Sequence, residues 1–199
     1  MRVSDLSPGS VEPLLRGRLG RPYRFVEECE STQRLVDPGE PEGTTVAADL
    51  QTHGRGRLGR TWEAPAGQAL LFSVLLRPAP PMVLWPELSL VAGGAVAAAI
   101  SSEAGVTAQL SHPNDVLVKG RKLAGILAEA STGRVSLGIG VNVNQATDDL
   151  PKETPKPPTS LRIETGREWP RAPLLAAILV ELERRYDEWQ RLHTNRQPG

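Results

Sequence analysis

The chain has 199 residues, enough for one domain with a full hydrophobic core. Its 23 lysines and arginines balance 23 aspartates and glutamates, so no net charge attracts nucleic acid or an anionic membrane. The single cysteine excludes an intrachain disulfide, and the first 20 residues contain no apolar run typical of a signal peptide. We therefore expect a soluble cytoplasmic protein that contacts neither nucleic acid nor membrane.

The first half of the sequence predicts three strands and a short helix. The helix follows Ser31, which is placed to cap it, and ends at Pro38-Gly39. The strand segments are rich in β-branched, aromatic or apolar residues, and they lie at 23–28, 44–51 and 68–78.

The most apolar stretch of the chain, 88–102, follows Pro86. It is too short for a membrane span and predicts a buried helix. Gly93 and Gly94 interrupt it, and we expect them to allow close packing on a sheet.

The second half predicts a strand hairpin, a third strand and a final helix. Residues 115–130 form two strand-like runs joined at Lys119-Gly120, and 134–144 form another. Residues 145–159 contain four prolines and predict a loop, whereas apolar residues at helical spacing predict an amphipathic helix over 170–192. Strands and helices do not alternate regularly. The fold class is therefore α+β, one domain over 1–199 with a mixed, mostly antiparallel sheet and helices mainly on one side.

The segment 54–60 concentrates three arginines and three glycines in seven residues. It matches the dinucleotide fingerprint G-x-G-x-x-G, but Pro65 and Gly67 follow where that motif requires a helix. A P-loop is also excluded, because Arg60 stands where a lysine is required. The composition suits a mobile loop that closes over an anionic ligand. Taken alone, it also suits a solvated basic loop or an RGG-like contact to nucleic acid.

Four segments, in their order along the chain, resemble the signature segments of biotin–protein ligases. They are ESTQ (30–33), QTHGRGRLGRTW (51–62), HPNDVLVKGRKLAGILAE (112–129) and GIGVNVN (138–144). The resemblance runs from about residue 22 to the last predicted helix.

This resemblance implies an enzyme that uses ATP and Mg²⁺ to join the carboxylate of biotin to the α-phosphate. Pyrophosphate is released, and biotin then passes from the adenylate to a lysine of a biotin carboxyl-carrier protein domain. A Gly/Arg loop suits this reaction, because cations offset the repulsion between two anions and a closed loop keeps water from the adenylate. A homodimer is a possible assembly that the sequence leaves open.

For biotin, the resemblance implies contacts to the ureido ring from Ser31, Thr32 and Gln51. A plain helix cap is the alternative role of Ser31. Gly54 is implied to contact the ligand through its backbone, and Gly125 to permit a close backbone approach.

Three cations are implied to be catalytic. Arg55 and Arg57 resemble the loop arginines that bind the biotinyl carboxylate and the α-phosphate region. Lys122 matches a lysine that bridges that carboxylate and the α-phosphate, so all three also belong to the biotin site.

For ATP, the resemblance implies seven residues: Arg57, Arg60, Trp62, Asn114, Asp115, Lys122 and Asn142. Arg60 is otherwise a solvated arginine, Trp62 a core residue and Asn142 a strand-end turn residue. No protein ligand is assigned to a metal ion, with Asp115 left open as one.

The sequence departs from the family pattern at Ser111 and His112, where Lys-Trp is usual, and mildly at Gln33, where asparagine is usual. A cation directed at phosphate is therefore missing, unless His112 or another cation fills the role. If no other cation fills this role, Ser111→Lys is expected to improve the use of ATP. If His112 or another cation already fills it, the added lysine is expected to crowd the site.

Two further expectations concern the ends of the chain: no DNA-binding helix-turn-helix domain before residue 20, and no C-terminal β-barrel domain. Two functional alternatives also stay open. One is a non-catalytic or weakly active relative that binds biotin or nucleotide, and the other is a lipoyl or octanoyl acyltransferase of the same superfamily.

Overall fold

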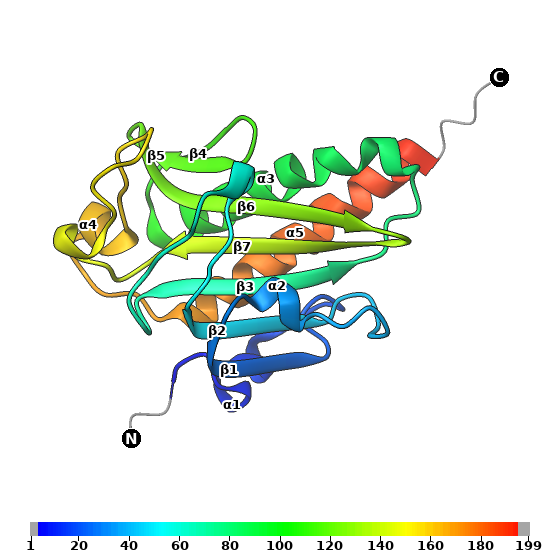
Figure 1. The fold of residues 1–199 in the computed structure, drawn as a ribbon, viewed down its shortest axis with the longest axis horizontal. Helices are drawn as coiled ribbons and strands as arrows, with labels where there is room; N and C mark the ends of the chain where they lie inside the picture. Colours follow the sequence, from blue (N-terminus) through cyan, green and yellow to red (C-terminus); the bar gives the residue numbers. More distant parts are fainter. Residues whose placement is uncertain (1–3, 195–199) are drawn as a thin grey trace.

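A mixed sheet of seven strands forms the centre of the structure, a computed structural model that describes residues 4–194 (Figure 1). Across the sheet the strands lie in the order β1 (Tyr23–Cys29), β2 (Thr45–Gln51), β3 (Ala69–Leu76), β7 (Arg134–Asn142), β6 (Arg121–Ser131), β5 (Asp115–Val118) and β4 (Ala108–Ser111). Strands β1 and β2 are parallel, and all other neighbours in this order are antiparallel. The predicted α+β class is confirmed; residues 1–3 and 195–199 of the predicted domain lie outside the described residues.

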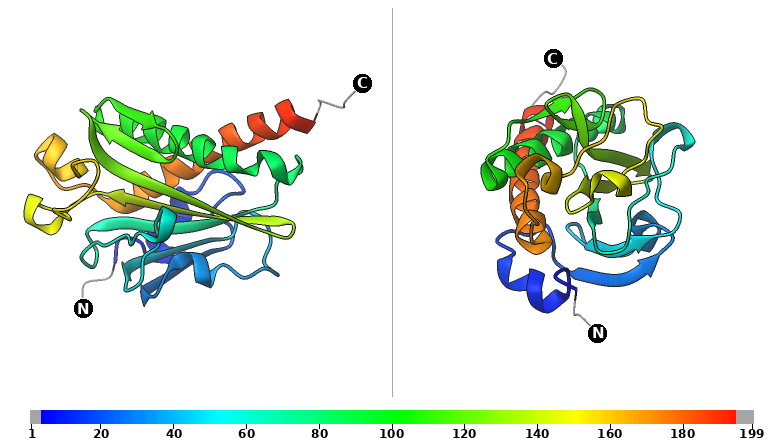
Figure 2. Two further views of the ribbon diagram at one scale, coloured as in Figure 1. Left: turned by 45° about the horizontal axis from the view of Figure 1, so that its top comes forward. Right: turned by 90° about the vertical axis from the view of Figure 1, so that its left-hand side faces the viewer.

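Two long helices, α3 (Leu88–Ala104) and α5 (Arg171–Thr194), pack against each other and cover one face of the sheet (Figure 2). The opposite face carries the short helix α2 (Thr32–Leu35) and the loop that joins β2 to β3. The prediction of helices mainly on one side is therefore also confirmed. The remaining helical segments are α1 (Pro8–Val11), α4 (Leu161–Thr165) and the 3-10 turns η1 (Glu12–Leu14), η2 (Arg57–Gly59), η3 (Met82–Glu87) and η4 (Thr147–Asp149).

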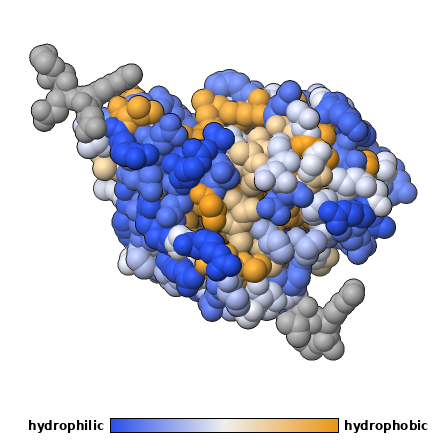
Figure 3. All heavy atoms as spheres, turned by 180° about the vertical axis from the view of Figure 1, so that it is seen from behind, coloured by the Kyte–Doolittle hydropathy of each residue, from blue (hydrophilic) through white to orange (hydrophobic). Residues whose placement is uncertain are grey.

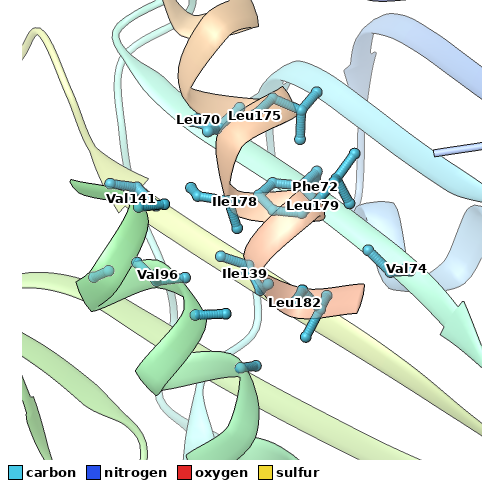
Figure 4. Close-up of a cluster of buried hydrophobic side chains, with 14 of the residues drawn as sticks. Leu70, Phe72, Val74, Val96, Ile139, Val141, Leu175, Ile178, Leu179 and Leu182 are labelled. Carbon is cyan, nitrogen blue, oxygen red and sulfur yellow. The ribbon is translucent and has the colours of Figure 1, made fainter. Parts of the chain in front are cut away.

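The core between the sheet and the long helices arises from two periodicities. β3 and β7 present alternate residues to the helices, whereas α5 presents residues three or four apart. The side chains that β3, β7 and α5 present to this core are buried, and burying each one stabilises the folded state by about 1.5–3 kcal/mol relative to leaving it exposed. Figure 4 shows Leu70, Phe72 and Val74 of β3, Ile139 and Val141 of β7, Val96 of α3, and Leu175, Ile178, Leu179 and Leu182 of α5.

Helix α3 is the apolar stretch that the sequence predicts to be buried. With the preceding turn it forms a helical segment of 23 residues, Met82–Ala104, which contains an 18-residue window of mean hydropathy 1.7 and is by length and composition able to cross a membrane. The expectation that it is too short for a span was therefore wrong, but the expectation of burial was right, because α3 packs on β4, β5, β6 and α5. The helix-covered face is mostly hydrophilic, with an apolar strip across its middle (Figure 3).

The paired glycines of α3 allow the predicted close packing. A Cβ atom on Gly93 would overlap the side chain of Leu110 in β4, and one on Gly94 would lie 3.1 Å from the guanidinium of Arg185 in α5. The helix nevertheless runs without interruption through both glycines. Packing on two sides therefore outweighs the low helix propensity of glycine.

Three local predictions differ from the structure. Helix α2 ends at Leu35 rather than at Pro38, and Ser31 takes the N-cap position without a side-chain cap hydrogen bond. Helix α3 begins at Leu88, because Pro86 lies inside the preceding 3-10 turn. Strand β4 was not predicted, since its four residues show no clear alternation and become a strand through pairing with β5.

Candidate active site

The face of the sheet opposite α3 and α5 has a floor of small residues. Gly125 of β6 pairs with Gly140 of β7, and Ser73 of β3 pairs with Gly138 of β7. Trp62 lies directly on the glycines: a Cβ on Gly140 would be 2.6 Å from its ring, and one on Gly125 would be 2.8 Å away. The missing side chains therefore make room for the indole and for whatever binds beside it.

A β-bulge aims Lys122 at this floor. Simple alternation would place Lys122 on the same face of β6 as Ala124 and Ile126, both of which are buried in the core. The register between β5 and β6 shifts, however, so that Leu123 has no partner and is itself buried in the core. The one extra residue in β6 reverses the face of the sheet to which the side chain of Lys122 points. Lys122 thus shares the face of Gly125, with its Cε 3.5 Å from a Cβ built there.

Two lysines hold the carboxylate of Asp115. The Nζ atom of Lys122 lies 2.8 Å from Oδ1, and the Nζ atom of Lys156 lies 2.8 Å from Oδ2. Lys122 also stands over the Trp62 ring, 5.6 Å from its centre. Burial alone would raise the pKa of Asp115, but the hydrogen bonds and charges of the two lysines outweigh it and lower that pKa. Asp115 is therefore a charged carboxylate that fixes the positions of the Lys122 and Lys156 ammonium groups.

Lys156 was missed by the reading of the sequence, which placed it in a structureless loop. The loop backbone pairs with β6: the amide of Lys122 donates to the carbonyl of Pro157 at 2.8 Å, and the amide of Thr159 donates to the carbonyl of Lys122 at 2.9 Å. The Nζ atom of Lys156 also donates to the hydroxyl of Ser111 at 3.1 Å. The only sequence signal was the run of prolines at 155, 157 and 158, which stiffens the backbone around this lysine.

The Gly/Arg loop reaches over the same face. The guanidinium of Arg55 binds both carboxylate oxygens of Glu129 in β6, at 2.8 and 2.6 Å, and Arg57 donates to the side chain of Asn114 at 3.4 Å. Leu58 is 87% exposed at a left-handed φ of 58°, and Arg60 is exposed. Gly54 needs its missing Cβ, which would overlap the carbonyl of Trp62. Glu129 is a second residue that sequence reasoning missed.

A buried polar cluster adjoins the floor at the end of β2. The amide and the hydroxyl of Thr32 donate to Oε1 of Gln51 at 2.8 and 3.0 Å, and the same hydroxyl lies 2.7 Å from Ser73 Oγ. Ser31, next to it, is only 2% exposed. Gln51 also lines a pocket of about 440 Å³ together with residues 63–65 and 149–151, a size that suits a small ligand.

Asn114 and Asn142 serve the scaffold with their amide groups. Asn114 Nδ2 donates to the carbonyl of Ile126 at 2.7 Å, which ties the turn before β5 to β6. Asn142 is buried, donates to the carbonyl of Thr159 at 3.0 Å and accepts from Gln145 at 2.9 Å. Asn142 therefore holds the loop that carries Lys156, and a contact from it to ATP stays a prediction.

Most of the predicted site residues thus fall into two adjoining groups on one face. Thr32, Ser31 and Gln51 form the polar cluster, and Lys122, Asp115, Trp62, Arg55 and Arg57 form a cationic group beside it, which Lys156 joins without having been predicted. Arg60 is exposed, and Asn142 binds Thr159 and Gln145 instead. Within residues 4–194 no three His, Cys, Asp or Glu side chains lie close enough together to hold a metal ion.

Comparisons with known proteins identify the family of the chain. Residues 27–145 match the model of the biotin/lipoate A/B protein ligase family. A bifunctional ligase/repressor BirA of Bacillus spizizenii is 39% identical over 180 residues, which cover 86% of this chain and 55% of that protein. The chain thus spans about half the length of the curated relatives it matches.

Solved structures show the same fold. The biotin protein ligase of Aquifex aeolicus, in complex with biotin and ATP, superimposes with a TM-score of 0.76 at 36% identity and covers 84% of this chain and 71% of its own. The biotin protein ligase of Leishmania major, in complex with biotinyl-5-AMP, gives a TM-score of 0.70 at 27% identity, over 86% and 77% of the two chains. With most of the sheet, the Gly/Arg loop and the Asp115–Lys122 pair inside the matched region, the chain belongs to the biotin/lipoate A/B protein ligase family.

Proposed function

We propose that this protein is an ATP-dependent biotin–protein ligase, which forms biotinyl-5′-AMP and transfers biotin to a lysine of a carboxyl-carrier protein domain. The observation that carries the proposal is the placement of Lys122 and Asp115 beside Trp62 on a floor of glycines, next to a buried polar cluster. A relative of the same fold is known in complex with biotin and ATP, and another with biotinyl-5-AMP, which supports both substrates.

The polar cluster is proposed to take the ureido ring of biotin. Ser31, Thr32 and Gln51 offer hydroxyl and amide groups in a setting where few waters compete. Gly54 and Gly125 let the backbone approach the ligand, and Arg55 and Arg57 are proposed to bind the biotinyl carboxylate and the α-phosphate.

The cationic group is proposed to take ATP. Lys122 bridges the carboxylate of biotin and the α-phosphate, and Trp62 packs beside the adenine. Asn114 and Asp115 place these groups, because one binds Arg57 and the other binds Lys122. Arg60 is exposed at the end of the loop and is free to reach phosphate when the loop closes.

The proposed chemistry has two balanced steps. An oxygen of the biotin carboxylate bonds to the α-phosphorus while the bond to the β-phosphate oxygen breaks, so that pyrophosphate leaves. The amine of the carrier lysine then attacks the acyl carbon, AMP leaves and the amine loses a proton. Lys122 and Arg57 act in the first step, because fixed cations offset the repulsion between the two anions and the charge that develops on the leaving group.

Mg²⁺ is proposed to arrive as part of the MgATP substrate. Both carboxylate oxygens of Asp115 already accept from lysines, so this residue is not arranged as a free metal ligand. Magnesium in nucleotide sites keeps several waters and binds largely through phosphate oxygens. The proposed compartment is a reducing cytoplasm, which a chain with one cysteine suits.

The adenylation assay tests this proposal. We expect the protein, with Mg²⁺ and ATP, to form an adenylate of biotin but little of lipoate, detected by mass spectrometry. Thr32 and Gln51 already pair with each other, so the discrimination rests on the side-chain NH2 of Gln51, which this pairing leaves free. Lipoate has no ureido oxygen to accept from that group, and a polar group left unpaired costs about 1–3 kcal/mol. A preference for lipoate would identify a lipoyl acyltransferase instead, and binding of biotin without an adenylate would identify a non-catalytic relative.

The Gly/Arg loop is expected to open and close around the ligands. The tip has its own backbone hydrogen bonds, such as Gly56 N–H to the carbonyl of Arg60 at 2.7 Å, but exposed side-chain contacts, above all Arg55–Glu129, hold it to the sheet. Such an exposed pair contributes about 0–1 kcal/mol. Backbone amides of residues 55–60 should therefore exchange rapidly in the free protein and become protected when biotin and ATP are added. Amides of β7 serve as the control, since they should exchange slowly in both states. Strong protection of the loop without ligand would rule out a mobile lid.

A further inference from the structure

We propose that Lys156 binds the triphosphate of ATP, so that the Pro-rich loop supplies a cation to the active site. The inference rests on the proposed adenylation function and adds a residue to it. It also names a cation that replaces the lysine usual in the family at position 111, where this chain has a serine.

The first argument is the fixed position of this lysine. The carbonyl of Pro157 and the amide of Thr159 bind the backbone of Lys122 at the bulge, so the loop is anchored at the residue proposed to bind the α-phosphate. The prolines on both sides of Lys156 restrict the backbone further. A lysine at an anchored position has a defined reach, unlike one on a free loop.

The second argument is charge. Asp115 carries one negative charge, while Lys122 and Lys156 together carry two positive charges. A salt bridge that only stabilises the fold requires one lysine, so the group holds a surplus cation. The two ammonium groups are at most about 8 Å apart, since each binds a different oxygen of one carboxylate. The extra positive charge attracts a ligand with several negative charges. Of the proposed substrates, the triphosphate of ATP is the one with several negative charges.

The third argument is access. The side chain of Lys156 is 34% exposed, so its ammonium group keeps a side toward solvent where a phosphate oxygen can bind. Its partner Ser111 is short and neutral, and accepts a hydrogen bond at 3.1 Å. A lysine at position 111 would bring its own ammonium group to the space that Lys156 Nζ occupies. The small side chain at 111 therefore suits a cation delivered from the loop.

The test compares ATP and biotin binding by calorimetry in the full chain. Lys156→Ala is expected to weaken ATP binding by about 10- to 100-fold, the range for a lost charge-assisted hydrogen bond, with biotin affinity changed less than about threefold. Lys156→Arg should retain most of the ATP affinity. Lys152→Ala is the matched control, because Lys152 is exposed on the same loop, and it should bind ATP as the parent does.

An exchange of positions sharpens the test. Ser111→Lys alone should bring no gain, because it crowds Lys156, whereas Ser111→Lys combined with Lys156→Ala should recover at least about tenfold of the lost ATP affinity. Parent-like ATP binding in Lys156→Ala overturns the proposal. So do equal losses for ATP and biotin, which would mean a purely structural lysine.

The adenylation assay separates this proposal from the proposed function. If the parent forms biotinyl-adenylate and Lys156→Ala keeps the parent KM for ATP, only the role of Lys156 is wrong. If the parent binds ATP but forms no adenylate, the function is wrong, and the calorimetric comparison still decides the role of Lys156. A parent that binds no ATP overturns both.

Discussion

Lys122→Ala is expected to lower the rate of biotinyl-adenylate formation by about 10²–10³-fold, the usual cost of removing one fixed donor from the charge that develops in a transition state. Lys122 reaches the floor of the site only through the bulge in β6, and Lys156 is held on the other oxygen of Asp115. No other described cation therefore has the same position. The measurement is single-turnover formation of the adenylate from biotin and MgATP.

The fold should survive this substitution. Lys122 is partly exposed, and Asp115 keeps Lys156 as a partner, so no buried charge is left unpaired. Lys119→Ala is the matched control: this lysine lies on the same hairpin, 73% exposed and paired with Glu164, and its loss should leave the rate unchanged. An adenylation rate within threefold of the parent in Lys122→Ala would show that the assigned role is wrong, and a large loss of thermal stability would indicate a structural lysine.

Arg171→Ala is expected to cause the largest loss of stability. The guanidinium at the start of α5 is 4% exposed and binds Asp5, Asp49 of β2 and the carbonyl of Ala69 in β3. Removing one partner of a buried ion pair leaves its charges uncompensated, and because Asp5 is 40% exposed we expect roughly 2–4 kcal/mol of unfolding free energy to be lost. In a chain of this size that corresponds to a melting temperature lowered by roughly 5–15 °C.

The control for this prediction lies on the same helix. Arg184 forms exposed ion pairs with Glu181 and Glu188, so Arg184→Ala should leave the thermal midpoint unchanged within error. Denaturant unfolding followed by circular dichroism gives the free energies of both variants. Equal midpoints for Arg171→Ala and the parent would mean that the two aspartates find water or other partners at no cost.

The sequence alone determined the elements whose signals are local. Runs of β-branched or apolar residues marked β2, β3 and β7, helical spacing marked α5, and Lys119-Gly120 marked the β5–β6 hairpin, where both residues have positive φ. The family motifs also selected Lys122, Asp115 and Trp62 by their sequence neighbours, and the structure brings these three side chains together in the candidate site. Such features depend on residues a few positions apart, so a single chain without coordinates displays them.

Only the tertiary structure decided where the cations point. Simple alternation would turn Lys122 toward the core, and the bulge at Leu123 that reverses it depends on the register between β5 and β6, which no local pattern encodes. Lys156 is 41 residues from Asp115 in the chain and arrives through backbone pairing of the loop with Lys122. Arg171 likewise joins the N-terminal segment, β2 and β3. Hydrogen bonds and ion pairs between residues far apart in the chain produce no periodic pattern in the sequence. The motifs therefore indicated the candidate site, whereas the positions of its charged groups depend on the tertiary fold.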